Sequence, residues 1–485
     1  MTEVKPDAHS DTSSPQAGVS NRQMFLLAAI SLLLCCAAAL GGSSYLSAPG
    51  WPALFVVGSL GVALGLFTVS VHDVRRYPGV LLISAVACLL PALQLIPLPP
   101  EIWHALPGRD LVTAVDAAAG LGAPWRPLSL VPVMTEHALM SLMVPLALVL
   151  LAVQLDDRHH ERLLWMLLLL ILGSALLAVA QNQVPALQGL LGYKRLDVDI
   201  ATGLFSNRNH QALMMACGLP LLLAAVRQRS GLLRQIGHVA VPTIVMGGAF
   251  ILLAMILVTG SRAGLLLYSV ALAGLPLMWP HDGNSHARVI SVSPLRMGLS
   301  IGSGVLMLAL IVVIAVDNRT ALAVIRLLES DPAGDLRPVI FEQTAEFVGR
   351  YWPAGTGIGT FIPIYALEEP VSLMQTAYIN QAHNDWLDIA LTGGAPGVAV
   401  LVGASLYMLW LAARHFFGTG GHARGQIFGR CASLIVLLCA LASIVDFPLR
   451  TPLMMSILAL ALVWTAQPLT PPVRTHGHIH RKLRA

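Results

Sequence analysis

Apolar blocks of membrane length recur along the whole chain, and they constrain the fold more than any other feature. Each block holds roughly 18 to 22 residues, which matches the ~20 residues that an α-helix needs to cross ~30 Å of hydrocarbon. We therefore predict an all-α fold, a polytopic integral membrane protein with about 12 transmembrane helices. The predicted spans begin near Met24, Trp51, Gly79, His137, Leu163, Gln211, Val239, Ala263, Met297, Trp386, Ile427 and Pro452.

The composition excludes an ordinary water-soluble protein. Hydrophobic residues make up 56% of the chain and charged residues only 11%, whereas soluble domains carry about 25% charged residues. All six cysteines fall inside apolar blocks, which suits small buried hydrophobes better than a disulfide framework or a zinc site. We expect membrane lipids as neighbours, and neither a cofactor nor nucleic acid as a partner.

Polar segments flank the apolar part of the chain. Residues 1–22 are rich in Ser, Asp and Pro, so we predict a disordered N-terminus. Residues 23–470 form the predicted membrane domain, whose first helix we expect to be retained because its apolar run lacks a convincing small-x-small cleavage site. Residues 471–485 form a basic tail that suits contact with anionic lipid.

The positions of Lys and Arg predict the orientation. Short connections on one side of the membrane are repeatedly basic, and such connections face the cytoplasm. Both termini are then cytoplasmic, and this arrangement requires an even number of helices. Three larger segments fall on the other side, at 97–136, 182–210 and 317–385.

The segment 317–385 is longer than ordinary connections, and such long segments are usually functional or disordered. Its aromatic residues, among them Trp352 and Phe361, favour order, and its aliphatic run 321–328 favours an interfacial helix. We predict a large, partly helical periplasmic loop. The glycine run 355–359 lacks the strand–turn–helix setting of a nucleotide loop, so we interpret it as a tight turn.

Three arginines fall at or near the ends of predicted helices on the loop side: Arg208, Arg262 and Arg337. A guanidinium keeps its charge and offers a planar fork of donors that fits phosphate oxygens. Together they predict a pyrophosphate site. The alternative for each is an interfacial anchor that extends to the lipid headgroups.

His383 and Asn384 lie directly before the helix predicted at Trp386. An imidazole titrates near neutral pH and accepts a proton from an attacking hydroxyl, whereas Asn384 or Asp385 equally suits the cap of the following helix. Asp446 lies at the loop-side end of the eleventh span, where a carboxylate is costly and usually paired. Arg450 is the local candidate for its partner, and one of the loop arginines is the more interesting candidate.

Two further patterns are weak. Asp197 and Asp199 form an Asp-x-Asp pair, but a lone pair of this kind on the loop side does not predict a metal site. His476, His478 and His480 belong to the basic tail, where binding to lipid is the simpler interpretation. We predict no metal site.

Several segments, taken in order, resemble the O-antigen ligase and O-antigen polymerase superfamily of bacterial envelope glycosyltransferases. They run from Gln94 to Pro452, and one difference is Ala442, where many members have histidine. The quoted segments are Phe205-Ser-Asn207-Arg208-Asn209-His210, Ser261-Arg262-Ala-Gly264, Arg337, Pro353 to Phe361, His383-Asn384-Asp385-Trp386-Leu387 and Asp446-Phe-Pro-Leu-Arg450-Thr-Pro452.

The resemblance implies transfer of a glycan from an undecaprenyl-diphosphate donor to a sugar hydroxyl on the periplasmic face of the inner membrane. The acceptor is lipid A-core in a ligase and a lipid-linked repeat unit in a polymerase of O-antigen or exopolysaccharide. The reaction would be metal-independent and inverting. His383 and Arg337 are the expected catalytic residues, Arg208, Arg262 and Arg337 the pyrophosphate ligands, and Asn207, Asn209, Asn384 and Asp446 the supporting residues.

Some alternatives stay open at this point. Sequence motifs do not separate a ligase, a polymerase and a protein glycosyltransferase. A transporter or flippase of lipid-linked oligosaccharide is the alternative from another class. Such proteins tend to carry ionisable residues inside their spans, whereas here the polar residues gather outside them.

Overall fold

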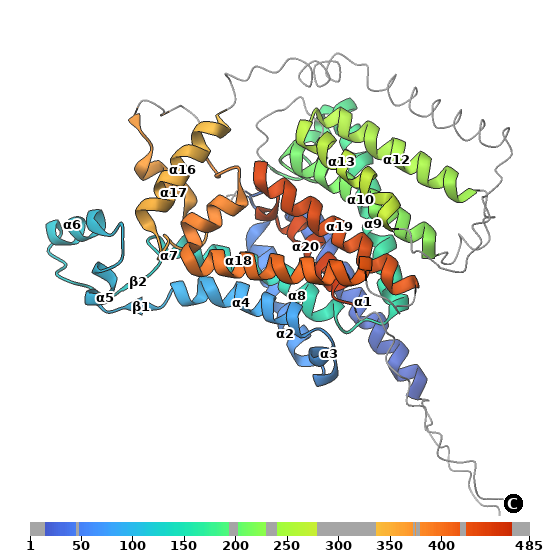
Figure 1. Cartoon of the computed structure of the whole chain (residues 1–485), viewed down its shortest axis with the longest axis horizontal. Helices are drawn as coiled ribbons and strands as arrows, with labels where there is room; N and C mark the ends of the chain where they lie inside the picture. The colour runs from blue at the N-terminus through green and yellow to red at the C-terminus, as the bar shows by residue number, and fades with distance from the viewer. Residues whose placement is uncertain are drawn as a thin grey trace, which may run out of the picture.

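The computed structural model describes residues 15–44, 48–193, 202–228, 240–278, 336–371, 374, 379–417 and 423–467. These residues are mainly helical (Figure 1). The longer helices are α1 (Pro15–Leu40), α2 (Trp51–Thr68), α4 (Pro78–Gln94), α7 (Pro132–Ser141), α8 (Met143–Ala152), α9 (Asp157–Gln183), α10 (Arg208–Gln228), α12 (Ala240–Thr259), α13 (Arg262–Gly274), α16 (Arg337–Tyr351), α18 (Asp385–Phe417), α19 (Ala423–Val445) and α20 (Pro452–Thr465). Shorter elements are α3 (Val71–Arg76), α5 (Pro100–His104), α6 (Asp110–Ala118), α17 (Phe361–Glu368) and the paired strands β1 (Pro97–Leu98) and β2 (Arg126–Pro127).

The all-α membrane fold is confirmed. Within the described residues, seven helices are long and apolar enough to cross a membrane, and four apolar helices are shorter. These eleven correspond to eleven of the predicted spans, and the span predicted near Met297 lies outside the described residues. Helix α1 begins at Pro15, ahead of the predicted domain boundary at 23.

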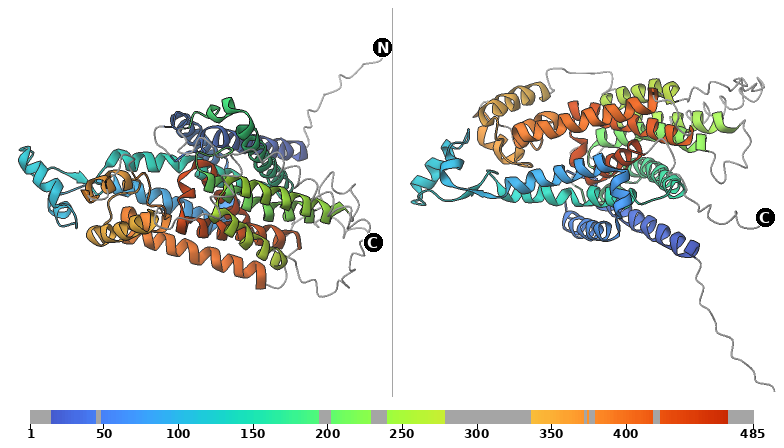
Figure 2. Two further views of the ribbon diagram at one scale, coloured as in Figure 1. Left: turned by 90° about the horizontal axis from the view of Figure 1, so that it is seen from above. Right: turned by 60° about the horizontal axis from the view of Figure 1, so that its bottom comes forward.

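The helices form a bundle with two distinct ends (Figures 1 and 2). We call one the loop end, because α5, α6, α16 and α17 extend from it. Here the Leu453 amide at the start of α20 donates to Gly41 at the end of α1 (3.0 Å). At the opposite end, the Trp464 indole of α20 donates to His160 of α9 (3.1 Å). The described parts of 97–136, 182–210 and 317–385 all lie at the loop end, as the sequence predicts.

Helix α10 lies at the centre of the bundle and packs against α9, α12, α13 and α19. Small residues along it allow close approach, which drives helix association in a membrane. One close approach is to α13, where a Cβ added at Gly264 would lie 2.3 Å from the Cβ of Ala212. Gly264 therefore sets the distance between the first turns of α10 and α13.

Helix α18 reverses direction near its start. Gly394 has a non-helical backbone (φ 59°, ψ −155°), so a short segment before it and a long segment after it meet at an angle. A Cβ at Gly394 would lie 2.3 Å from the Pro353 carbonyl oxygen. The kink is thus packed directly against the segment that follows α16.

The glycine run 355–359 is the tight turn predicted from the sequence, since Gly355, Gly357 and Gly359 all have positive φ. Its amides bind other elements. Thr356 and Gly357 donate to the carbonyls of Leu391 and Thr392 in α18, and Ile358 donates to Gln94 of α4 (2.8 Å). These bonds join the turn to α18 and α4, so the role of the turn is structural.

A small lobe of β1, β2, α5 and α6 extends beyond the loop end (Figure 2). The buried guanidinium of Arg109 fastens it, because it donates to the carbonyls of Leu128 and Gly355 at 3.0 Å each. Burial lowers the pKa of Arg109 to about 10, which still leaves the group charged at neutral pH. Asp116 of α6 and Arg126 of β2 form a further ion pair within the lobe.

Candidate active site at the loop end

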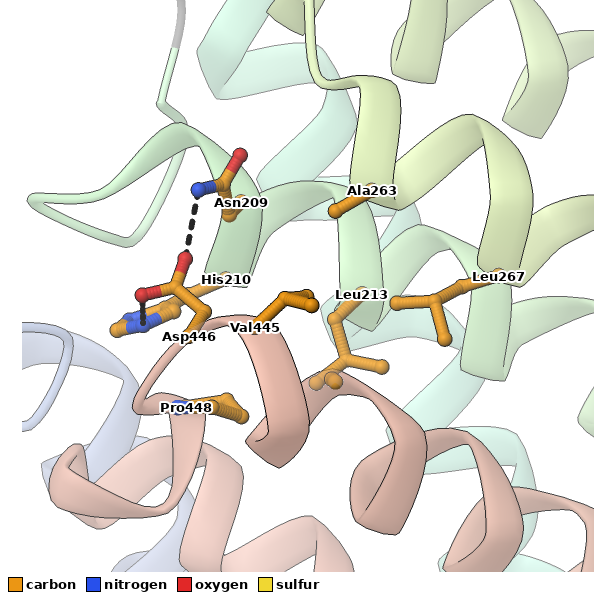
Figure 3. A pocket seen from close by; sticks show the side chains of 9 residues that line it. Asn209, His210, Leu213, Ala263, Leu267, Val445, Asp446 and Pro448 are labelled. Carbon is orange, nitrogen blue, oxygen red and sulfur yellow. Dashed lines mark hydrogen bonds and ion pairs between the residues drawn. The ribbon is translucent and has the colours of Figure 1, made fainter. Parts of the chain in front are cut away.

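Asp446 is the centre of a polar cluster at the loop end. It directly follows α19, and it is only 3% exposed. One carboxylate oxygen accepts a hydrogen bond from the side-chain amide of Asn209 (2.6 Å), and the other accepts one from the Phe447 amide (2.9 Å). Figure 3 shows Asn209 and His210 on either side of the carboxylate. A buried carboxylate needs such partners to offset the loss of water.

Two histidines approach the same oxygen of Asp446. His383 Nδ1 lies 3.6 Å from Oδ1, and His210 Nε2 lies 3.9 Å from it. The ring of Phe447 packs edge-on against both imidazoles, with centroids 4.8 Å and 5.2 Å away. His210 is buried, whereas the side chain of His383 is 25% exposed. His383 is therefore the imidazole that a substrate can reach.

His383 also has an unusual backbone, with φ at 50° in the left-handed region. Such a conformation is uncommon for residues other than glycine, and it persists only where neighbouring contacts hold it. Asn384 follows as the cap of α18, since its side-chain oxygen accepts a hydrogen bond from the Leu387 amide (3.0 Å). The structural alternative for Asn384 therefore holds.

Asn209 connects Asp446 to a second helix end. Its side-chain oxygen accepts a hydrogen bond from the Ser261 hydroxyl (2.8 Å), while its amide nitrogen donates to Asp446. Ser261 in turn caps α13 by accepting a hydrogen bond from the Gly264 amide (3.0 Å). The two partners fix the orientation of the Asn209 amide, because one side offers a donor and the other only acceptors.

The arginines predicted to bind pyrophosphate begin three helices. Arg208 is the first residue of α10, next to Asn209, and it is half-buried. Arg262 is the first residue of α13, next to Ser261, and it is exposed. The Ser261–Asn209 bond therefore brings these two helix ends together. Arg337 begins α16, which packs against α18, and the contacts of the Asp446 cluster described above do not include it.

Of the two partners expected for Asp446, the local candidate Arg450 pairs elsewhere. Arg450 lies in the 3-10 turn that follows Phe447, and its guanidinium contacts Asp388 (2.8 Å) and Asp385 (3.4 Å) instead. The short turn directs it toward the first turns of α18 rather than back toward Asp446. Arg450 and its two carboxylates form a second polar group adjacent to the first.

Asn207 supports the first turn of α10. Its side-chain oxygen accepts a hydrogen bond from the backbone N–H of Asn209 (2.8 Å), and its side-chain nitrogen lies 3.4 Å from His210 Nε2. His210 and Ser261 belong to the motifs that resemble the superfamily, but no role was expected for them. Their adjacency to Asn209 and Arg262 is the sequence feature that could have indicated one. Asp197, Asp199 and the histidines of the tail lie outside the described residues.

A small pocket lies beside Asp446, with polar residues at one side and apolar residues below (Figure 3). Its apolar lining comes from α10, α13 and α19, and includes Ala442. A histidine at 442 would lie against this pocket. In the described part of the chain, no group of three or more His, Cys, Asp or Glu residues is arranged to hold a metal ion.

Asp446 is ionised at neutral pH. Burial alone would raise the pKa of its carboxyl group, but His383, His210 and the Asn209 amide together lower the pKa well below its usual range. An ionised carboxylate beside His383 stabilises the imidazolium that forms when the ring accepts a proton.

We expect Asp446→Asn to lower glycan transfer by about 100-fold, because the substitution removes the negative charge and keeps the shape. The lowered pKa also means that Asp446 stabilises the fold above about pH 4 and loses this contribution as the pH falls further. Thermal unfolding across this range should therefore be less dependent on pH in the variant. Equal transfer rates in the variant and the parent would contradict the role.

Comparison with known families identifies a stretch that carries part of this site. Residues 247–402 match the family model described as O-antigen ligase. This stretch is similar to the O-antigen ligase family. The match confirms the resemblance to the O-antigen ligase superfamily, and it supports a glycosyltransferase of the ligase and polymerase type that acts on lipid-linked glycans. No curated protein matches the chain significantly.

The O-antigen ligase match runs from α12 into α18, so it includes Arg262, Arg337 and His383. Arg208, Asn209 and Asp446 lie outside it. The hydrogen bonds of Asn209 nevertheless join the two parts in space. The site is thus assembled from the matched stretch and the helices on either side of it.

Proposed function

We propose that the chain transfers a glycan from an undecaprenyl-diphosphate donor to a sugar hydroxyl on the periplasmic face of the bacterial inner membrane. The observation that carries the proposal is the pairing of a buried, ionised Asp446 with the partly exposed His383. This pair lies where α10 and α13 begin with Arg208 and Arg262. A proton acceptor next to fixed positive charges suits the cleavage of a sugar–pyrophosphate bond.

Arg208, Arg262 and Arg337 would bind the pyrophosphate. A polyprenyl donor keeps its pyrophosphate at the headgroup level, and helix ends at the edge of a bundle lie at the same depth. Negative charge on the pyrophosphate grows as the sugar leaves. Fixed guanidinium groups therefore stabilise the transition state more than the bound donor. Arginines can supply this neutralisation without a metal ion, so the proposed reaction is metal-independent.

His383 would act on the acceptor. Its Nδ1 faces Asp446, which leaves Nε2 for the acceptor hydroxyl. The acceptor oxygen attacks the anomeric carbon while the bond from that carbon to the pyrophosphate oxygen breaks. The hydroxyl proton passes to Nε2, and undecaprenyl diphosphate leaves with the bonding electrons. A single displacement of this kind inverts the anomeric configuration.

The proposed arrangement in the membrane follows from the two ends of the bundle. The loop end would face the periplasm, and the opposite end and both termini would face the cytoplasm. Short connections at the opposite end are basic, with Arg75 and Arg76 between α2 and α4, and Arg158 and Arg162 at the start of α9. This distribution follows the positive-inside rule. The proposed membrane domain spans 23–470, with its large loop at 317–385.

Deletion of the gene, followed by profiling of envelope glycans, tests the proposed function. We expect loss of long polymer if the chain is a polymerase, and full-length polymer left on its lipid carrier if it is a ligase. Complementation by the parent gene should restore the profile, and complementation by His383→Ala should not. An unchanged profile in a strain that makes the glycan would contradict the proposal.

A chelator distinguishes the arginine mechanism from a metal-dependent one. Transfer by purified protein in proteoliposomes is expected to persist in EDTA. Activity that is lost in EDTA and restored by Mg²⁺ would exclude neutralisation by arginine alone.

A further inference from the structure

We propose that Arg450 is a positioning residue that holds His383 against Asp446. The inference rests on the proposed function, because it concerns the proton acceptor of that reaction. Arg450 touches neither member of the pair in the contacts described above. It acts through the two chain segments that carry them.

Arg450 joins two carboxylates that lie one turn apart on α18. Its Nη2 lies 2.8 Å from Asp388, and its Nε lies 3.4 Å from Asp385. The carboxylate side chains are 3% and 10% exposed, and that of Arg450 is 19% exposed. Removal of one partner from such a buried ion group leaves the other charge uncompensated, which is costly. The planar fork of arginine can contact both carboxylates at once, whereas an ammonium is a single point charge.

The ion group can affect the His383–Asp446 pair because its members lie close to both residues in sequence. Asp385 comes two residues after His383, and Arg450 comes four residues after Asp446. The same two segments therefore meet at the His383–Asp446 pair and again at Arg450. The second contact limits how far the first can open.

Further bonds tie the same two segments together. The Ser443 hydroxyl donates to Asp385 (2.8 Å), and the Leu449 amide approaches the same carboxylate oxygen (3.4 Å). The Trp386 indole donates to the carbonyl of Ala440 in α19 (3.1 Å). Asp385 therefore receives donors from both sides of Asp446 in sequence, and Arg450 supplies the positive charge of the group.

The left-handed backbone of His383 makes this support necessary. A residue with φ at 50° tends to relax unless its surroundings hold it. Relaxation would move the imidazole relative to Asp446 and to the bound acceptor. A displacement of about 1 Å in a reacting group lowers the rate about 100-fold. Arg450 thereby contributes to the transfer rate without contact with substrate.

Kinetics of purified variants in proteoliposomes test the proposal. Arg450→Gln and Arg450→Lys should each lower kcat about 100-fold, with the donor KM changed less than about twofold, because the arginines that bind pyrophosphate are unaltered. Arg126→Gln is the matched control, since Arg126 also pairs with a buried carboxylate but lies in the α5–α6 lobe. Folded Arg450 variants that transfer at the parent rate would overturn the proposal.

Carbethoxylation of His383 gives a readout that does not depend on glycan transfer. The probe is diethyl pyrocarbonate, and mass spectrometry measures the modification of His383 at fixed pH. We expect the rate to rise on the order of tenfold in Arg450→Gln and Arg450→Lys, because the released imidazole is more accessible. The Arg126→Gln variant should react like the parent. An unchanged rate at His383 in all variants would overturn the proposal.

Asp388→Asn serves if the Arg450 variants fail to fold. It keeps the volume of the side chain and weakens the same group, so His383 should again react faster, and an unchanged rate would count against Arg450. The two readouts also separate the hypotheses. Faster modification of His383 in the Arg450 variants, together with a parent protein that transfers no glycan, would retain the positioning role and reject the proposed function.

Discussion

Replacement of His383 by alanine is expected to lower glycan transfer by at least about 100-fold while the protein still inserts and folds. A positioned proton acceptor contributes about 100-fold to 10,000-fold to such a reaction. The loss should be greater than in Asp446→Asn, because the carboxylate acts only through the imidazole. Transfer from lipid-linked donor to acceptor, measured in proteoliposomes at equal amounts of folded protein, checks this.

His104→Ala is the matched control for this experiment. His104 is an exposed histidine of α5, in the lobe fastened by Arg109. Its removal should leave transfer within about twofold of the parent, because exposed side chains outside a site change stability little. Normal transfer by His383→Ala would remove the catalytic assignment and leave His383 as a structural residue of the loop end.

Loss of Arg337 is the second large effect that we expect. Arg337→Ala should lower kcat/KM by about 100-fold to 1,000-fold, the range seen when one fixed donor to a developing negative charge is removed. Arg262→Lys should also transfer poorly, because an ammonium does not reproduce bidentate contact with phosphate. Initial rates over a range of donor concentrations separate a loss in donor KM from a loss in kcat.

Arg350→Ala provides the control on the same helix. Arg350 lies in the last turn of α16 and pairs with Glu368 of α17. Because its side chain is 46% exposed, the pair contributes little to stability, and transfer should stay close to that of the parent. If Arg337→Ala behaves like Arg350→Ala, Arg337 is an interfacial anchor rather than a pyrophosphate ligand.

The fold was largely predictable because block length alone identifies helices that cross a membrane. Polar contacts between helix ends, by contrast, depend on how the bundle packs. The sequence placed Asp446 at the end of a span and required a partner for it, for which Arg450 was the local candidate and a loop arginine the other candidate. In the structure, the turn after Phe447 directs Arg450 away from Asp446. The hydrogen bond to Asp446 comes instead from Asn209, which lies 237 residues earlier in the chain. Local spacing carries no information about such pairings.

The candidate site was predictable in its residue types more than in its connections. The motifs around Asn209, Ser261 and His383 contain the residues that meet at the loop end. Their order along the chain does not reveal that one asparagine joins the cap of α13 to the carboxylate after α19. The role of the glycine run was easier to predict, because the run lacks the strand–turn–helix setting of a nucleotide loop and no Gly-Lys-Ser follows it.

The close approach at Gly264 has a consequence for variation among such chains. The gap between the first turns of α10 and α13 is set by a missing methyl group, not by the connections that join the helices. Insertions in those connections would leave the spacing of Arg208 and Arg262 unaltered, whereas a single added carbon at 264 would widen it. The distance between the helix ends that carry Arg208 and Arg262 thus depends on a residue that has no side chain.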